Sequence, residues 1–111
     1  MGYFPNVALD RATANVTGPV AKLATVHSKL SMQVVLTGSP SGGTVTLQGS
    51  LDGINFDATT ALATFTIGTD TSGAIKFSID KPVSAYRVVL ASLAGGTSPT
   101  VTATVGVGAP S

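Results

Sequence analysis

The sequence predicts an all-β fold, a single antiparallel β-sandwich of about 7–8 strands with an extended N-terminal arm. All five acidic residues are Asp, and the absence of Glu removes a residue that is typical of helix surfaces. Thr, Val, Ser and Gly are abundant instead, as in strands and the turns between them. Apolar residues alternate with polar ones at a period of two, and Gly, Pro and Ser recur roughly every eight to twelve residues. This spacing favours a sandwich over βαβ units.

Six stretches carry the clearest alternation, and the linkers inside each successive pair have the composition of turns. The sequence therefore predicts three hairpins, made of residues 29–37 with 43–50, 63–67 with 75–80, and 85–90 with 101–107. In the second hairpin the apolar set Ile75, Phe77 and Ile79 is expected to face the core. Weaker strands are expected over residues 11–17 and 19–26. Residues 20–24 could form one helical turn but lack caps and length.

Three parts are expected along the chain: an extended arm over residues 1–9, the β-sandwich over residues 10–107, and a short tail over residues 108–111. The arm carries Tyr3, Phe4 and Pro5, an aromatic pair followed by a residue that favours extended backbone. Its composition lacks the cationic and apolar regions of a secretory signal, so a cytosolic origin is the default expectation.

Charge is scarce in this sequence. Charged residues make up 10% of the chain against about 25% in typical domains, and the formal net charge is +1. Without a basic field, neither nucleic acid nor a membrane surface is an expected partner. The chain has no Cys, which excludes disulfides, thiolate metal sites and a Cys nucleophile. Its longest apolar runs, such as residues 88–91, are far too short to span a membrane.

The residues of an enzyme site are also missing. His27 is the only His, so a two-His metal site cannot form and any Ser-His-Asp triad must use it. No G-x-S-x-G sequence occurs, and His27 lies at an expected strand junction. We therefore expect no enzyme, no catalytic residues and no cofactor, with His27 an ordinary surface or edge residue.

Residues 49–57, GSLDGINFD, hold two acidic side chains and a tight-turn dipeptide, and three interpretations are open: a metal loop, a ligand-binding loop or a corner between strands. The EF-hand pattern fails because Ala63 stands eleven positions after Asp52, where an acidic residue is needed. A different loop site, with Ca²⁺ bound by Asp52, Asn55 and Asp57, stays possible.

The corner fits residues 49–57 best. In this interpretation Asp52 and Gly53 supply the positive-φ pair of a tight turn. Leu51 or Ile54 would shield the strand edge, and Phe56 would return to the core. No metal ligand is predicted.

Arg87 lies in an expected strand among apolar neighbours. Its expected role is an exposed or interface salt bridge, with Asp80 or Asp57 as candidate partners. The residues predicted to form an interface are Tyr3, Phe4, Pro5, Asp52, Asn55 and Arg87.

Residues 44–56, TVTLQGSLDGINF, resemble the pattern "strand, then G-S-x-D-G-x-x-aromatic" of small β-sandwich proteins in tailed-phage virions. Residues 85–90, 95–97 and 101–105 resemble the closing hairpin of the same proteins. The resemblance implies a non-enzymatic virion protein, most of all a capsid decoration (cement) protein that stabilises the head lattice through its N-terminal arm and its strand and loop contacts. A tail-tube or tail-adaptor component is the alternative.

The same resemblance implies the partners and the location. The partners would be the major capsid protein or other virion subunits, together with further copies of this chain, and the location would be the virion, assembled in the host bacterial cytoplasm. An S-x-D-G-x-x-aromatic stretch also occurs in discoidin-like sandwiches, so a carbohydrate- or Ca²⁺-binding module is a rival from another class.

Overall fold

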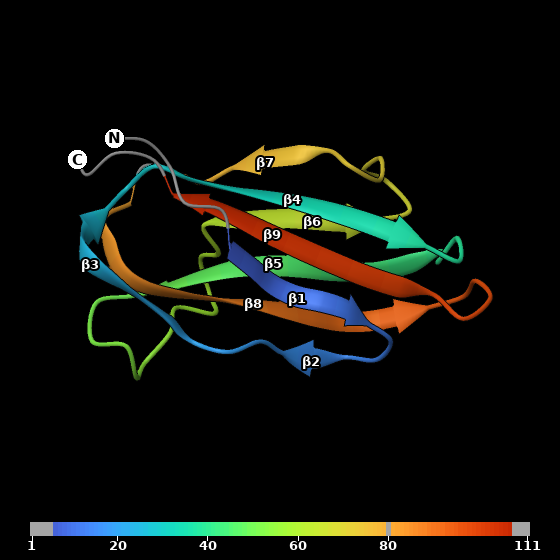
Figure 1. The fold of residues 1–111 in the computed structure, drawn as a ribbon, viewed down its shortest axis with the longest axis horizontal. Coiled ribbons are helices and arrows are strands. Elements are labelled where there is room, and N and C mark those ends of the chain that lie inside the picture. Colours follow the sequence, from blue (N-terminus) through green and yellow to red (C-terminus); the bar gives the residue numbers. More distant parts are fainter. Residues whose placement is uncertain (1–5, 80, 108–111) are drawn as a thin grey trace.

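The computed structural model describes residues 6–79 and 81–107, which form two antiparallel β-sheets packed face to face (Figure 1). The predicted all-β sandwich is confirmed. Among these residues no helix is long and apolar enough to cross a membrane. The described strands are β1 (Asn6–Ala12), β2 (Val16–Thr17), β3 (Ala21–His27), β4 (Leu30–Thr37), β5 (Gly42–Ser50), β6 (Ala63–Ile67), β7 (Ile75–Phe77), β8 (Val83–Ala94) and β9 (Thr100–Val107).

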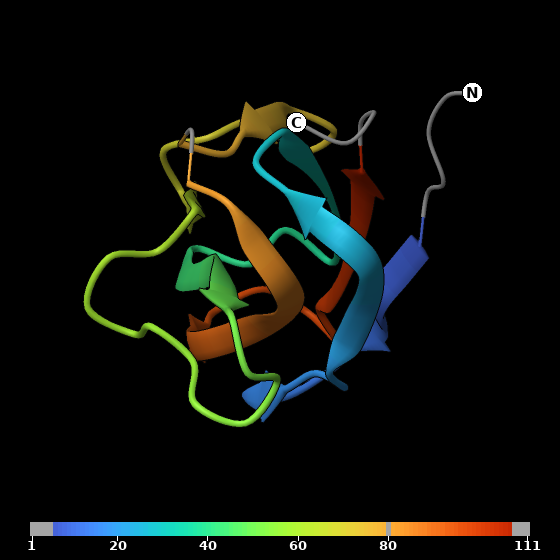
Figure 2. The ribbon, with the colours of Figure 1, turned by 90° about the vertical axis from the view of Figure 1, so that its left-hand side faces the viewer.

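Sheet A has the strand order β1-β9-β4-β7, and sheet B has the order β2-β8-β5-β6. The short strands β2 and β3 follow one another along the same edge of β8, where Val16 lies opposite Leu90 and Ala21 lies opposite Tyr86. Figure 2 shows the two layers nearly end on, with β1, β9, β4 and β7 in one layer and β8 and β5 in the other. The strand predicted over residues 19–26 is thus confirmed from Ala21 onward, and no helical turn forms over residues 20–24.

The core lies between the sheets and follows the predicted alternation. In β4 the side chains of Leu30, Met32 and Val34 are buried, and the polar residues between them face outward. From sheet B, Val45, Leu47 and Phe65 meet them and are fully buried. Burial of these apolar side chains is the main favourable contribution to the stability of the fold.

The three predicted hairpins are wrong. β4 pairs with β9 and β7, β5 pairs with β8 and β6, and β8 and β9 belong to different sheets. The linkers after β4, β6 and β8 therefore cross from one sheet to the other. A strand with one buried face alternates in the same way whether its neighbour along the chain lies beside it or across the core, so the alternation located the strands but not their pairing.

The hairpin that does form joins β5 to β6, with Leu47 opposite Ala63 and Gly43 opposite Ile67. Its loop contains most of GSLDGINFD. The sequence prediction of a corner between strands is correct for this segment, but the corner is a long hairpin loop and not a tight two-residue turn.

The arm predicted over residues 1–9 is too long, because β1 begins at Asn6 and pairs with β9. Ala8 and Leu9 are buried in the core, so this part of the chain belongs to the sandwich. This segment forms a strand because pairing with β9 lets it bury Ala8 and Leu9 in the core. Tyr3, Phe4 and Pro5, and the tail over residues 108–111, lie outside the described residues.

The predicted orientation of the segment around β7 is also wrong. Ile75, Phe77 and Ile79 are exposed, and Lys76 lies opposite Met32, on the core side of the sheet edge. An edge position lets the Lys76 ammonium reach the Asp70 carboxylate at 2.7 Å, so this face need not be apolar.

Candidate functional site

The segment between β5 and β6, residues 51–62, protrudes from one end of the sandwich as a wide loop (Figure 2, green to yellow-green). We call it the Asp52 loop. Its base is fixed by two backbone hydrogen bonds, in which Asp57 N donates to Gly49 O at 3.0 Å and Leu62 N donates to Leu47 O at 2.7 Å. The Leu62 side chain is buried in the core and holds the returning end of the loop. The loop is therefore anchored at both ends.

The first half of the loop is organised by Asp52. Its Oδ1 accepts hydrogen bonds from Ile54 N and Asn55 N, both at 2.8 Å, and from the Ser50 hydroxyl at 2.9 Å. Its Oδ2 accepts a hydrogen bond from Asn55 Nδ2 at 2.8 Å. In a regular strand, backbone carbonyl groups would accept hydrogen bonds from Ile54 N and Asn55 N. Here the Asp52 carboxylate accepts them instead.

The predicted positive-φ pair is only half correct. Gly53 has a φ of 75°, while Asp52 is not among the residues with positive φ. Asp52 is needed for its side-chain oxygens rather than for backbone freedom, and Gly53 supplies the left-handed residue.

The second half of the loop is organised by Asp57. Its Oδ1 accepts hydrogen bonds from Thr59 N and Thr60 N, both at 3.0 Å. Its Oδ2 pairs with the Lys81 ammonium, which comes from the segment before β8. Two carboxylates therefore hold the two halves of the loop, each by accepting backbone N–H groups within three residues.

These hydrogen bonds also determine the protonation of the loop. The Asn55 backbone and side-chain N–H groups, with Ile54 N and the Ser50 hydroxyl, hold the pKa of Asp52 far below its usual range. Lys81, followed by the Thr60 backbone N–H, lowers the pKa of Asp57. Both carboxylates are charged at neutral pH and already have partners, Asp52 within the loop and Asp57 within the loop and at Lys81.

Cation binding is poorly served by this arrangement. Both oxygens of Asp52 already accept hydrogen bonds, and the Asp57 carboxylate is shared between two backbone N–H groups and an ammonium. Within residues 6–79 and 81–107 no group of three or more His, Cys, Asp or Glu residues could hold a metal ion. A Ca²⁺ ion would have to displace these bonds and would still lack the six to eight oxygen ligands that it prefers.

A shallow hollow of about 320 Å³ lies at the base of the loop. Its polar lining comes from Ser50, Asp52, Asn55, Asp57 and Lys81, the same residues that hold the loop together. No aromatic ring of the described residues lines it, although small-molecule sites are usually rich in apolar and aromatic surface. The hollow is the inner side of the hydrogen-bonded loop and provides no stacking surface for a sugar ring.

Two apolar side chains project from this ordered loop. Leu51 is 71% exposed and Ile54 is 79% exposed. The prediction that Leu51 or Ile54 shields the strand edge is wrong. The hydrogen bonds to Asp52 form a turn between the two residues, and both side chains are exposed. The loop thus holds two exposed aliphatic side chains on a backbone that is anchored at both ends.

Arg87 lies on the outer face of sheet B, where its Nε donates to Gln48 Oε1 at 2.8 Å. Its guanidinium carbon is 4.5 Å from the centre of the Phe56 ring, a cation–π contact. Phe56 is half-buried beneath Arg87 and does not join the core, contrary to prediction. Of the two partners predicted for a salt bridge with Arg87, Asp57 pairs with Lys81 instead, and Asp80 lies outside the described residues.

His27 does not form a Ser-His-Asp triad with the described residues. In such a triad the Nδ1–H of the His donates to a carboxylate. Here Nδ1 is buried and has no hydrogen-bond partner among the described residues, and Nε2 lies 3.3 Å from the Thr25 hydroxyl.

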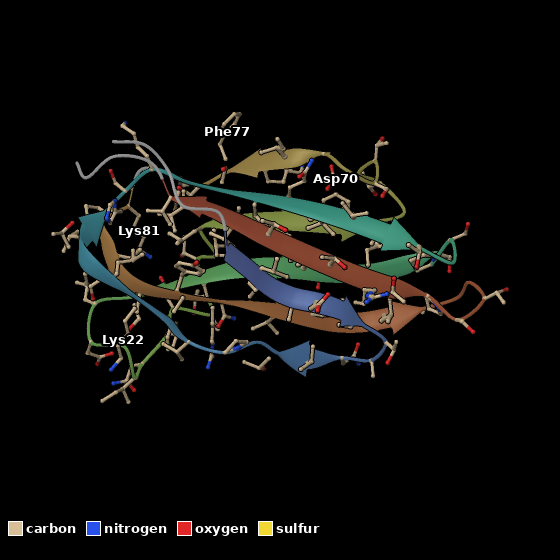
Figure 3. All side chains as sticks on the ribbon, viewed as in Figure 1. Lys22, Asp70, Phe77 and Lys81 are labelled. Atoms are coloured by element: carbon tan, nitrogen blue, oxygen red, sulfur yellow. The ribbon has the colours of Figure 1, made fainter. Side chains whose placement is uncertain are left out.

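The predicted interface residues are thus partly brought together. Asp52 and Asn55 form one hydrogen-bonded unit, and Arg87 contacts the same loop through Phe56. Sequence reasoning missed the exposure of Leu51, Ile54 and Phe77 (Figure 3 shows Phe77 pointing away from β7). The exposure of Leu51 and Ile54 could have been expected from the sequence. They flank the turn dipeptide Asp52-Gly53, and a turn at the protein surface cannot bury the side chains on both sides of it.

Comparisons with known proteins place the fold. No protein-family model matches the chain, and no curated protein matches its sequence. Among solved structures, the SPBc2 prophage-derived protein YomS is similar with a TM-score of 0.69 and 11% sequence identity, over 96% of this chain and 93% of YomS. The PBSX exported protein XepA also reaches a TM-score of 0.69, at 14% identity, over 96% of this chain and 38% of XepA. The predicted resemblance to phage β-sandwich proteins is thus confirmed at the level of the fold.

Proposed function

We propose that this protein is a non-enzymatic structural subunit of a phage particle, most specifically a head decoration protein that binds the capsid lattice. The observation that carries this proposal is the fold shared with a prophage-derived protein of nearly the same length, over 96% of the chain. The surface supports it, because the ordered features that project from the sandwich are apolar contact residues rather than clustered catalytic groups.

Attachment is assigned to two elements. The first is the Asp52 loop, whose anchored backbone presents Leu51 and Ile54 without the entropy cost of ordering a flexible loop on binding. The second is the part of the N-terminal arm that precedes β1, residues 1–5, with Tyr3 and Phe4 as anchors. Each apolar anchor contributes on the order of 1 to 3 kcal/mol when it is buried, and the symmetry of a lattice multiplies such modest contacts.

Removing the attachment elements is expected to weaken particle binding while the sandwich stays folded. The variants are a deletion of residues 2–5, which leaves β1 intact, and the double substitution Leu51→Ser with Ile54→Ser. We expect each to reduce affinity at least tenfold, since about 1.4 kcal/mol corresponds to a factor of ten. Co-sedimentation of the purified protein with phage particles that lack it measures the effect.

The matched control is Val16→Ser, which removes an exposed aliphatic side chain from β2. Val16 lies opposite Leu90 of β8, five residues along that strand from Ala85, which lies opposite Ser50 at the base of the loop. It should bind particles as the wild type does. If the deletion and the double variant bind as tightly as this control, neither element attaches the protein.

A tail component, either a tail-tube or an adaptor subunit, is consistent with the same fold. Electron microscopy of particles with bound protein separates the two roles, because a decoration protein covers the head and a tail subunit forms a ring or tube. The carbohydrate- or Ca²⁺-binding alternative has less support, because Asp52 already pairs with Asn55 and Asp57 already pairs with Lys81.

A further inference from the structure

The Asp52 loop contains an Asp that is followed directly by Gly, whereas the four other Asp residues of the chain precede Arg, Ala, Thr and Lys. Asp-Gly is the pair in which an Asp isomerises most readily in a flexible chain, because Gly has no side chain to hinder attack by its backbone nitrogen. The sequence therefore places the most labile Asp of the chain in this loop.

Isomerisation requires one bond to form inside the loop. The backbone nitrogen of Gly53 attacks Cγ of Asp52 in its neutral carboxylic acid form, and the acid OH leaves with the amide proton as water. The product is a five-membered succinimide. When water opens this ring at the new Cγ–N bond, Asp52 is restored. When water opens it at the original peptide bond, the product is isoaspartate, whose backbone runs through Cβ and Cγ.

The structure holds the attacking nitrogen in a hydrogen bond. Gly53 N donates to Ser50 Oγ at 2.9 Å, and Asp52 N donates to the same oxygen at 3.2 Å. Ser50 is 5% exposed and lies at the end of β5, opposite Ala85 of β8, so the strand fixes its position. The Gly53 N–H must lose its proton for the nitrogen to attack. A hydrogen-bonded N–H is shielded from the water that would accept this proton.

The carboxylate is held as well. Asp52 Oδ1 accepts hydrogen bonds from the Ser50 hydroxyl, Ile54 N and Asn55 N, and Oδ2 accepts one from Asn55 Nδ2. Ring closure expels one of these two oxygens, so it must break the hydrogen bonds of whichever oxygen leaves. The Asn55 N–H groups, with Ile54 N and the Ser50 hydroxyl, also hold the pKa of Asp52 far below its usual range, so the neutral acid that can release water is scarce.

We propose that Asp52-Gly53 is a latent isomerisation site, which the hydrogen bonds of Ser50 and Asn55 keep closed in the folded protein. Ser50 restrains both reactants, because its hydroxyl accepts from the Gly53 N–H and donates to the Asp52 carboxylate. Isomerisation then proceeds from the locally opened loop. The inference concerns the isolated protein and does not depend on the function proposed above.

The consequence of the reaction lies at the tip of the loop. Isoaspartate adds one backbone atom between Leu51 and Ile54, which carry the two exposed aliphatic side chains of the loop. The hydrogen bonds to Asp52 therefore preserve the spacing of these side chains as the protein ages.

Prolonged incubation of the purified protein tests this proposal. Wild type, Ser50→Ala and Asn55→Ala would be kept for several weeks at neutral pH and physiological temperature, beside wild type unfolded in guanidinium chloride. Labelling by an isoaspartate-specific methyltransferase, with mass spectrometry of proteolytic fragments, measures isoaspartate at residue 52. We expect the folded wild type to form it far more slowly than the unfolded chain. Ser50→Ala should form it about ten- to hundredfold faster than the folded wild type, and Asn55→Ala should show a smaller increase.

Ser72→Ala is the matched control. Its hydroxyl also accepts a backbone N–H, from Leu36 at 2.9 Å, but it lies in the linker between β6 and β7, at the opposite end of the sandwich from the Asp52 loop (Figure 1). This variant should isomerise as slowly as the wild type, and circular dichroism checks that all three variants fold.

Three results would overturn the proposal. The first is a folded wild type that isomerises as fast as the unfolded chain. The second is a folded Ser50→Ala or Asn55→Ala variant that is as slow as the wild type. The third is a Ser72→Ala variant that accelerates as much as Ser50→Ala, because a general loss of stability would then explain the effect.

Discussion

Phe65→Ala is expected to destabilise the protein by about 3 to 5 kcal/mol, a large part of the 5 to 15 kcal/mol by which a typical domain is stable. Phe65 lies on β6 with no exposed surface, and it is the largest of the fully buried side chains. The sheets are held apart by their other side chains, so the cavity can collapse only in part. Guanidinium unfolding followed by circular dichroism measures the loss.

Phe77→Ala is the matched control, with the same substitution at an 81% exposed position on β7. Its effect should stay within about 0.5 kcal/mol. Similar losses for the two variants would contradict the assignment of Phe65 to the core and of Phe77 to the solvent-exposed side of β7.

Gly96→Ala is expected to destabilise the protein by about 2 to 5 kcal/mol. Gly96 has a φ of 76°, and a Cβ added there would lie 2.3 Å from Gly38 O, in the linker between β4 and β5. The linker between β4 and β5 and the linker between β8 and β9 are further joined by a hydrogen bond from Thr97 N to Gly38 O at 2.8 Å. Since the clash is with backbone, the linkers must separate to accommodate the methyl group.

Gly73→Ala separates the two contributions to this loss. Gly73 has a φ of 91°, but no atom lies within 4 Å of an added Cβ. It should cost only about 1 to 2 kcal/mol, the strain of a left-handed residue. Equal losses in thermal or denaturant unfolding would show that the close approach of the two linkers does not contribute to the effect of Gly96→Ala.

The local pattern of the sequence was enough to locate most strands. Alternation around Met32, Val45, Phe65 and Val105 reflects the burial of one face of each strand, and the structure buries all four. Pairing could not be obtained in the same way. The linker predicted over residues 38–43, which the structure limits to residues 38–41, is long enough either to turn back in a hairpin or to cross the distance of about 10 Å between sheets.

The orientation of the strand around β7 was also predicted wrongly from its alternation. The pattern over residues 75–79 was predicted to face the core, but its apolar residues lie on the outside of the edge strand β7. Period two fixes which residues share a face and not which face is buried. The partner of Lys76, which is Asp70 in the preceding turn, became visible only once the topology was known.

The candidate site was predicted in position but not in its chemistry. GSLDGINFD indicated a loop between strands, and Gly53 has the positive φ that a turn needs. The hydrogen bonds of Asp52 to residues two and three positions later could have been expected from the turn propensity of Asp. The contact between Phe56 and Arg87 could not, because it joins residues 31 positions apart on different elements.

The central claim, that this protein is a structural part of a phage particle, is tested most directly by the composition of the particle itself. Particles of the phage or prophage that encodes the chain would be purified on a density gradient and analysed by quantitative mass spectrometry. We expect peptides of this chain at many copies per particle, in a fixed ratio to the major capsid protein in every fraction that contains particles. Its absence from intact particles, with the protein present in the lysate, would contradict the claim.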